Sequence, residues 1–345
     1  MYTYADVCMS PRIYLTTFLL SLFTIIQAKP ADDIILYGIE LGINQDYDKA
    51  LAIFEDQQAQ NPGDPAPHLY KAGIYQTMMM DFESDHWREN FNQEINSLTL
   101  LCDSLLRLNA QDNRVLYFKA AGLSYASFQL AHEKKYLTSI RTAITAINNL
   151  EKVLERDSSY CDALLAIGAY QYWRSYLTRH FAWLPFFSDQ RAQGIHLLEK
   201  VYHQSTYSKW AAMSNLGWIY IQEKQFKKAV RCAENGLLKF PESRFFLWLE
   251  GEASFHDRQF ERAEKTFSKL LYSVTAEKYN NHYNEIVLHY KLAECHHELG
   301  NDSDAMFHAN KVLEIVPDEN VKQRIRKKQY KAVELVRLIN QKSLP

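Results

Sequence analysis

The side chains in this 345-residue chain that could carry out chemistry are few, and the histidines are the most regularly spaced of them. His282, His289 and His296 lie seven residues apart, so on one helix they would fall on roughly the same face. Seven residues correspond to about 10 Å along a helix axis, which is too far for neighbouring histidines to share one ion. Polar surface or groove histidines are the better interpretation, with weak metal binding or pH sensing as the alternative. We therefore predict no metal centre.

The other reactive groups form no catalytic arrangement that the sequence identifies. Glu294 and Glu298 are one helical turn apart beside the histidines, where pairing on a helix surface accounts for them. The chain contains no phosphate-binding glycine loop, no Gly-x-Ser-x-Gly elbow and no His-Glu-x-x-His motif. Its five cysteines include no Cys-x-x-Cys pair, and four of them are expected to be buried free thiols. We predict that the protein is not an enzyme and needs no cofactor.

The net charge of −2 and the estimated pI of 6.6 argue against a nucleic-acid partner, because no basic field is available to hold a phosphate backbone. The partner expected is therefore a protein or a peptide.

The N-terminus has the features of a secretory signal. Arg12 is followed by the apolar stretch from Ile13 to Ile26, and Ala28 provides a small residue for cleavage. The stretch is short for a membrane span, so we interpret residues 1–28 as a signal peptide, with an uncleaved anchor as the alternative. Translation from Met9 would give a cleaner signal. The sequence thus predicts an exported protein, which in a bacterium would be periplasmic or in the cell envelope.

A spaced pattern of small and aromatic residues recurs along the rest of the chain. Its clearest copy reads Met213-x-x-Leu216-Gly217-x-x-Tyr220, then Ala229-x-x-x-Ala233, then Pro241. Small residues let two antiparallel helices approach, the tyrosine fills the space between them, and the proline ends the second helix. This pattern resembles the tetratricopeptide repeat family. The resemblance implies an all-α protein built of stacked helical hairpins.

Marker positions place seven such hairpins along the chain. The first helices are marked by Gly38, Gly73, Gly122, Gly168, Gly217, Gly251 and Ala293, which are separated by 35, 49, 46, 49, 34 and 42 residues. Two of these steps match the 34-residue family repeat, and the longer ones indicate insertions. We predict an α-solenoid of about seven hairpins over residues 31–317. Residues 318–345 follow, with a polar capping helix over about 320–341.

The predicted insertions are the places where function is most expected. They fall at residues 78–87, around 132–142 and at 174–187, within the second, third and fourth hairpins. The last segment concentrates aromatic residues around a proline: Phe181, Trp183, Phe186 and Phe187. Three interpretations remain open: a cluster tucked onto the array, a tip that touches a partner or a membrane, and the lining of a ligand pocket.

Directly after this segment, Asp189-x-Arg191-x-x-Gly194-x-x-x-Leu198 is similar to a stretch of the fungal inclusion-body clearance proteins and their animal relatives. The similarity is confined to this stretch, and no function is carried across from it.

The family resemblance also implies a binding surface, because the first helices of tetratricopeptide hairpins line a concave groove. The residues expected to contact a partner there are Tyr172, Trp173, Trp218, Phe245, Trp248, Phe255, His256 and Tyr290. Large aromatic side chains are favoured at binding hot spots. We predict a scaffold that binds an apolar or amphipathic partner segment in this groove.

Two alternatives to partner binding in that groove remain open. The protein's own insertions, with Trp183 or Phe186 as a plug, could fill it. A carrier of an apolar or glycan small ligand could use the same aromatic walls. Ser214 and Trp218 stand where some family members have Lys and Asn, so capture of a C-terminal carboxylate is not expected.

Overall fold

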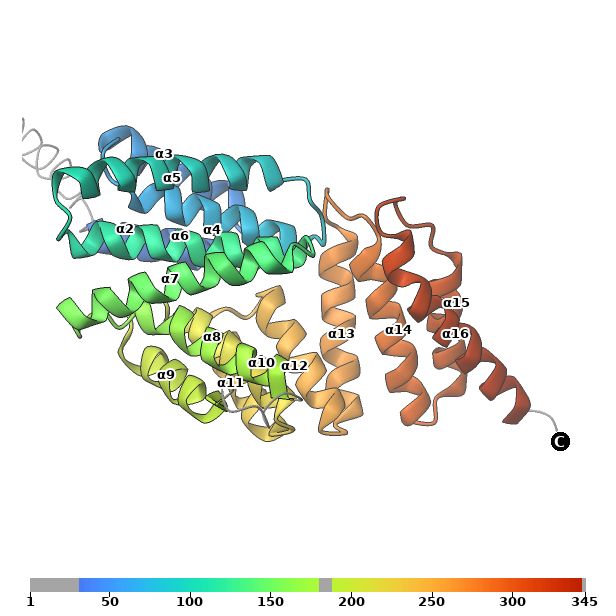
Figure 1. Cartoon of the computed structure of the whole chain (residues 1–345). Helices are drawn as coiled ribbons and strands as arrows, with labels where there is room; N and C mark the ends of the chain where they lie inside the picture. Colours follow the sequence, from blue (N-terminus) through green and yellow to red (C-terminus); the bar gives the residue numbers. More distant parts are fainter. Residues whose placement is uncertain (1–30, 180–187, 343–345) are drawn as a thin grey trace, which may run out of the picture.

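Fifteen α-helices and no strand make up the part of the chain that the computed structural model describes, residues 31–179 and 188–342 (Figure 1). The helices are α2 (Ala31–Ile43), α3 (Tyr47–Gln60), α4 (Ala66–Asp81), α5 (Arg88–Leu108), α6 (Asn113–His132), α7 (Tyr136–Arg156), α8 (Ala163–Thr178), α9 (Arg191–Gln204), α10 (Lys209–Gln222), α11 (Phe226–Lys239), α12 (Arg244–His256), α13 (Phe260–Thr275), α14 (Tyr283–Glu298), α15 (Asp302–Glu314) and α16 (Lys322–Lys342). They pair in order into seven hairpins, α2–α3 to α14–α15, and α16 follows alone. The predicted all-α solenoid of about seven hairpins with a C-terminal helix is confirmed.

Five of the hairpin turns share one backbone geometry. In each, a residue with positive φ stands two positions before the second helix: Gln45, Lys134, Lys224, Arg258 and Gly300, with φ values of 63, 63, 57, 61 and 77°. Each turn has the same two hydrogen bonds, for example from Lys224 N to Ile221 O and from Gln225 N to Tyr220 O. The sequence repeat is therefore also a repeat of backbone conformation. Only one of the five left-handed residues is a glycine, so glycine alone would not have located these turns.

The predicted insertions of the second and third hairpins lie largely within helices. α5, α6 and α7 contain 21, 20 and 21 residues, whereas each of the other hairpin helices contains 13 to 16. Between α6 and α7 only residues 133–135 form a turn, so the segment around 132–142 is mostly helical. The 78–87 segment is different, because it ends α4 and then forms the turn that leads to α5.

Packing accounts for the short motif around Gly194. α8 and α9 cross where Gly168 meets Gly194, and a Cβ atom at Gly194 would lie 2.6 Å from the Gly168 carbonyl oxygen. Leu198, one turn further on, is fully buried. Asp189 and Arg191 pair across the start of α9 at 2.8 Å. The motif thus specifies a close helix crossing.

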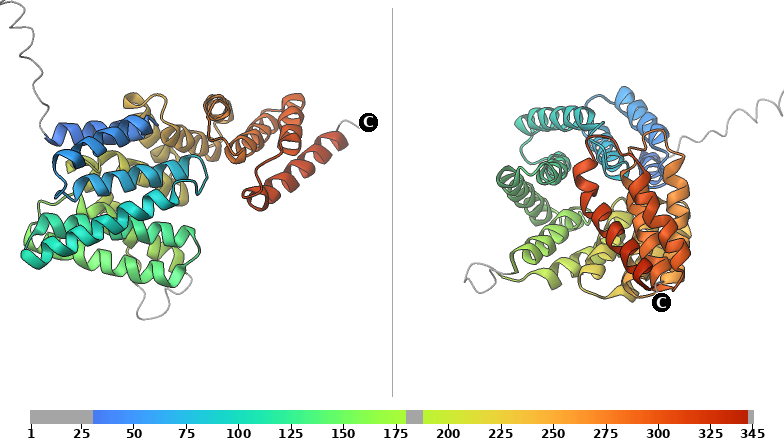
Figure 2. Two further views of the ribbon diagram at one scale, coloured as in Figure 1. Left: turned by 90° about the horizontal axis from the view of Figure 1, so that it is seen from above. Right: turned by 90° about the vertical axis from the view of Figure 1, so that its right-hand side faces the viewer.

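The superhelical winding of the array brings its first two hairpins into contact with its sixth hairpin. In the end-on view, the helices from α2 to α12 lie around a ring (Figure 2). Ile43, at the end of α2, packs against the hydrophobic core formed by α8 to α12. α16 packs on α14 and α15 and buries Ile325 and Ala332 there. No helix within the described ranges is long and apolar enough to cross a membrane.

Candidate functional site

The predicted groove residues on α8 and α10 stand beside one shared core. Trp173 and Trp218 are both half-buried against it. The ring of Trp173 meets that of Tyr176 edge-on at 5.8 Å, and the Tyr176 hydroxyl donates to Gln222 Oε1 at 2.8 Å. Tyr176 was missed by the sequence reasoning, although it lies one turn after Tyr172 on the same helix.

On α12, three predicted aromatic residues are half-buried: Phe245, Trp248 and Phe255. Phe255 lies under the ammonium group of Lys291, 5.0 Å from the ring centre, and Lys291 also pairs with Glu252 at 2.9 Å. We call the six half-buried aromatic side chains of these three helices, which the family resemblance expects to line the groove, the inner aromatic face: Trp173, Tyr176, Trp218, Phe245, Trp248 and Phe255. Trp173, Tyr176 and Trp218 pack on the core of α8 to α12, and Trp248 and Phe255 pack on the neighbouring core that includes α13.

Three other predicted residues do not belong to this face. Tyr172 has no exposed surface, and its hydroxyl donates to Glu223 at 2.8 Å. Burial and that carboxylate raise the pKa of Tyr172 above its usual value. Tyr290 is 8% exposed and donates to Glu294. Both side chains therefore hold the array together and offer little surface to a partner. The exposed His256 stacks on Phe226 at the tip of the preceding hairpin, with ring centres 5.6 Å apart.

The carboxylates Glu252 and Glu294 on α12 and α14 lie next to the basic helix α16. Lys331 stands over the ring of Tyr290 at 5.9 Å. Lys328 is close enough to Lys291, Glu252 and Glu294 to sense their charges, and burial lowers its pKa. The C-terminal helix thus places its own cations beside these carboxylates.

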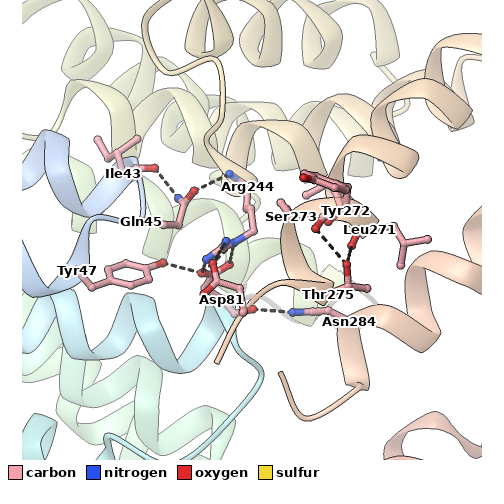
Figure 3. Close-up of polar contacts among 12 residues, drawn as sticks. Ile43, Gln45, Tyr47, Asp81, Arg244, Leu271, Tyr272, Ser273, Thr275 and Asn284 are labelled. Carbon is pink, nitrogen blue, oxygen red and sulfur yellow. Dashed lines mark hydrogen bonds and ion pairs between the residues drawn. The ribbon is translucent and has the colours of Figure 1, made fainter. Parts of the chain in front are cut away.

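Arg244 and Asp81, from the sixth and second hairpins, form the most buried ion pair of the described residues (Figure 3). Arg244 Nε donates to Asp81 Oδ1 at 2.9 Å, and the two side chains are 6% and 2% exposed. The Tyr47 hydroxyl donates to the other Asp81 oxygen at 2.9 Å, and Arg244 also pairs with Glu277. Burial alone would lower the pKa of Arg244, but Asp81 outweighs it and raises that pKa, so the guanidinium stays charged.

Hydrogen bonds to backbone groups extend this contact on both sides. Ser243 donates to Ile43 O at 2.8 Å, and the Gln45 side chain accepts from Arg244 N at 3.0 Å. Asn281 donates to the carbonyl oxygens of Phe82 and Glu83, each at 3.1 Å. Asn284 likewise donates to Asp81 O at 2.6 Å. We call this set of contacts the closing seam: Ile43, Gln45, Tyr47, Asp81, Phe82, Glu83, Ser243, Arg244, Glu277, Asn281 and Asn284.

A cleft of about 330 Å³ opens beside the seam. Its walls come from the tips of the second and third hairpins and from the start of α16, including Met79, Met80, Phe128 and Arg324. The 78–87 segment therefore supplies both Asp81 of the seam and a wall of this cleft. The sequence predicts an insertion at this segment but does not indicate its contacts.

The histidines form a cluster that includes a member from the next helix. His289 Nδ1 lies 2.8 Å from Nδ1 of His308 on α15, and the His296 ring stacks on His308 with centres 5.4 Å apart. His282 stands apart and contacts Glu285 at 2.7 Å. Burial, followed by the neighbouring histidines, lowers the pKa of His308 to about 4. No group of three or more His, Cys, Asp or Glu in the described ranges is arranged to hold a metal ion.

Some predicted features lie outside the described residues, namely the signal segment 1–28 and the aromatic residues Phe181, Trp183, Phe186 and Phe187. The four cysteines within the described ranges are free thiols. Cys102 and Cys295 are buried, while Cys161 and Cys232 are half-buried. Burial raises the pKa of Cys102 and of Cys295 to about 12, so these two thiols are poor nucleophiles.

Comparison with solved structures agrees with the tetratricopeptide-type fold. One chain of the APC/C hetero-tetramer Cut9–Hcn1 is similar with a TM-score of 0.57 at 13% identity, over 96% of this chain and 53% of that one. This chain therefore spans about half the length of that neighbour. Other similar structures are PilW, a type IV pilus biogenesis factor (TM-score 0.48, 14% identity, 76% of this chain and 98% of that one), and part of a TPR repeat-containing protein from Cytophaga hutchinsonii (TM-score 0.44, 15% identity, 88% and 99%). At these identities the likeness concerns the fold alone. No family model matches the sequence, and neither does any curated protein.

Proposed function

We propose that this protein is a non-enzymatic scaffold that binds a segment of a partner protein against its inner aromatic face. The observation that carries the proposal is that α8, α10 and α12 each present a half-buried tryptophan: Trp173, Trp218 and Trp248. Such rings keep part of their area available while the core fixes their orientation. They therefore offer a partner a large contact at a low cost in side-chain entropy.

The closing seam supports this role. It links the second hairpin to the sixth and seventh hairpins. The position of α12 is therefore fixed by its neighbours along the chain and also by contacts with the start of the array. A binding surface that is already rigid loses less conformational freedom on association, and its affinity is correspondingly higher. The proposal thus combines an aromatic contact surface with a frame that keeps it in one shape.

The test is capture of the partner by photocrosslinking in cells, with the crosslinker at position 218, followed by mass spectrometry. We expect a defined set of crosslinked peptides from one partner protein. Trp218→Ala with Trp248→Ala should lower capture at least about tenfold, because hot-spot truncations cost about 2 kcal/mol each. The matched control, Leu238→Ala with Tyr272→Ala, changes two large side chains that are 85% and 81% exposed and should leave capture unchanged.

Two results would contradict the proposal. If both double variants capture the partner equally well, the inner aromatic face is not the contact. If tryptophan fluorescence of the purified protein shifts with lipids or oligosaccharides and no protein is crosslinked, the protein is instead a carrier of a small ligand.

Export belongs to the same proposal. Its support is the sequence around Arg12, Ile13–Ile26 and Ala28. N-terminal sequencing of the protein recovered from its native cells should find Lys29 as the first residue. A product that keeps the apolar stretch and stays in the cytoplasmic fraction would refute this part of the proposal without touching the scaffold role.

A further inference from the structure

The first half of α7 carries an apolar face that no other element of the described structure covers. Tyr136, Leu137, Ile140 and Ile144 are 60%, 76%, 53% and 44% exposed. The last three are spaced at i, i+3 and i+7, so they share one side of the helix. On the same side one turn later, Ile147 is 8% exposed and belongs to a core shared with α8.

The divergence of α7 from α8 explains why this face is uncovered. α8 follows α7 and runs antiparallel to it. The two helices are close where α7 ends and α8 begins, and they diverge towards the start of α7 (Figure 1). The side of α7 that is buried near Ile147 therefore emerges into solvent near Leu137. We call the four exposed side chains, Tyr136, Leu137, Ile140 and Ile144, the α7 face.

The charged residues of the first half of α7 and of the two turn positions before it are all basic. Residues 134–150 contain Lys134, Lys135 and Arg141 and no acidic residue. α8, whose end lies at the same end of the hairpin stack, contains Arg174 and no acidic residue, and Arg179 follows it. Glu133 is the nearest carboxylate in sequence, and it is engaged by Lys135 at 2.8 Å and by Arg88 at 3.4 Å. In a chain of net charge −2, this is a local surplus of positive charge.

Most of these cations lack an acidic partner within the described ranges. No ion pair there involves Lys134, Arg141, Arg174 or Arg179. Arg174 instead donates to the neutral Gln190, and Arg179 donates to the carbonyl oxygen of Tyr176. The guanidinium of Arg141 is on the α7 face itself, since it is one turn from Leu137.

The other half of α7 provides an internal contrast. Its exposed side carries Glu151, Lys152 and Glu155, a mixture of charges that is ordinary for a solvated helix. Other exposed large apolar residues, such as Leu238 and Tyr272, are single, and single ones need no explanation. Within the described ranges, the first half of α7 combines four exposed apolar side chains with basic residues and no acidic one.

We propose that the α7 face docks on a lipid bilayer that contains anionic lipid. Tyr136, Leu137, Ile140 and Ile144 enter the boundary between headgroups and acyl chains, while Lys134 and Arg141 lie against lipid phosphates. Interfacial amphipathic helices bind in the same way, with the apolar side inserted and the basic residues at the headgroups. Each basic residue near an anionic surface contributes about 1 kcal/mol to the free energy of binding. Because α7 is the second helix of its hairpin, docking leaves the inner aromatic face on the first helices free.

The test is co-sedimentation of the purified full chain with vesicles. Vesicles of phosphatidylcholine that contain phosphatidylglycerol should carry the protein down, and pure phosphatidylcholine should bind it at least about tenfold more weakly. Leu137→Asp with Ile140→Asp, and separately Lys134→Glu with Arg141→Glu, should each lower binding to the anionic vesicles at least about tenfold. The matched control is Leu238→Asp with Tyr272→Asp, which changes equally exposed apolar residues elsewhere and should bind like the unmodified protein. Helicity and the melting temperature should be unchanged in all variants, because every substituted side chain is exposed.

Three outcomes would overturn the proposal: no binding of the unmodified protein to anionic vesicles, equal binding by the α7 variants and the control, or binding that does not depend on lipid charge. Loss of a protein partner by the α7 variants, without any vesicle binding, would assign the surface to protein contact and would also reject a lipid role.

Discussion

Two polar contacts between helices of this array, the closing seam and the histidine cluster, differ in how their charges are balanced. In the closing seam, Asp81 and Arg244 are opposite charges from distant hairpins and are bound to each other. In the histidine cluster, His289 and His308 are like groups from adjacent helices. Their Nδ1 atoms share one hydrogen bond, which needs one protonated and one unprotonated nitrogen.

Because their charges are balanced differently, the two contacts should respond differently to side-chain substitution and to acid. The seam is balanced as long as both partners are present, so removing one of them leaves a buried charge uncompensated. The cluster is balanced only while its rings are neutral, so added protons disturb it although no side chain is missing. Substitution should therefore affect the seam most strongly, and acid should affect the cluster before it affects the seam.

Arg244→Met should have the largest effect. It keeps much of the side-chain volume but leaves Asp81 buried beside Tyr47 without its counter-charge, and such losses cost about 3–5 kcal/mol. We expect a large fall in the urea midpoint, and small-angle X-ray scattering should show a larger radius of gyration as the winding opens. The double variant Asp81→Asn with Arg244→Met should recover much of the loss. A double variant as unstable as the single one would show that Asp81 is not left uncompensated.

Asn281→Ala should have the next largest effect. Its side chain donates to the carbonyl oxygens of Phe82 and Glu83, and removing it leaves these acceptors unpaired at a cost of about 1–3 kcal/mol. Hydrogen exchange should become faster around residues 82–87 and remain unchanged in α10 and α11. The matched control is Asn310→Ala on the exposed side of α15, which should alter neither. Equal effects of the two substitutions would contradict a specific role for Asn281.

The fold could be predicted because its signals are local. Gly217, Tyr220 and Ala229 report the packing within one hairpin, and the same spacing recurs along the chain. The seam could not be predicted in this way. Asp81 and Arg244 are 163 residues apart, and each is an ordinary charged residue at a helix end. Only the summed rotation of several hairpins brings them together, and residue spacing does not encode that rotation.

The candidate site was predicted in part, for a related reason. Trp173, Trp218 and Trp248 lie on first helices, as the repeat spacing predicts, and they are half-buried. Their contact with a partner stays a prediction. Tyr172 and Tyr290 could not be told from them, because their burial depends on Glu223 and Glu294 and on the position of α16. The spacing of His289 and His296 concerns α14 alone, so it does not indicate that His308 of α15 joins them. Aligning the two helices of the predicted hairpin would have placed it nearby.

Acid should weaken the histidine cluster by a smaller amount. The pKa of His308 is about 4 in the folded chain, below the usual 6.5, so its contribution to stability is complete above pH 6.5 and is lost as pH falls towards 4. His289, with its pKa also lowered by burial, adds to the loss in the same direction. Solvent reaches the half-buried ring of His308, which reduces the expected loss at pH 5 to about 1 kcal/mol.

The measurement is the melting temperature between pH 7 and pH 5. His308→Gln should flatten its pH dependence. His256→Gln removes an exposed histidine that has no part in the cluster and should leave the pH dependence as it was. A pH dependence that survives His308→Gln unchanged would place the proton uptake elsewhere.

The smallest loss of stability should come from removing a partly exposed ion pair. Like the Arg244–Asp81 pair, it joins an arginine to a carboxylate from a distant hairpin. Arg324 of α16 pairs with Glu83, and the two side chains are 37% and 28% exposed. Partly exposed pairs contribute about 0–1 kcal/mol and are screened by salt. Arg324→Met should therefore lower the urea midpoint only slightly, and added salt should remove the difference from the unmodified protein. The same salt should not narrow the gap between Arg244→Met and the unmodified protein. If Arg324→Met lowers the urea midpoint as much as Arg244→Met does, the burial of an ion pair does not determine how strongly it stabilises the closed array. That result would contradict the difference we expect between the buried pair and the exposed one.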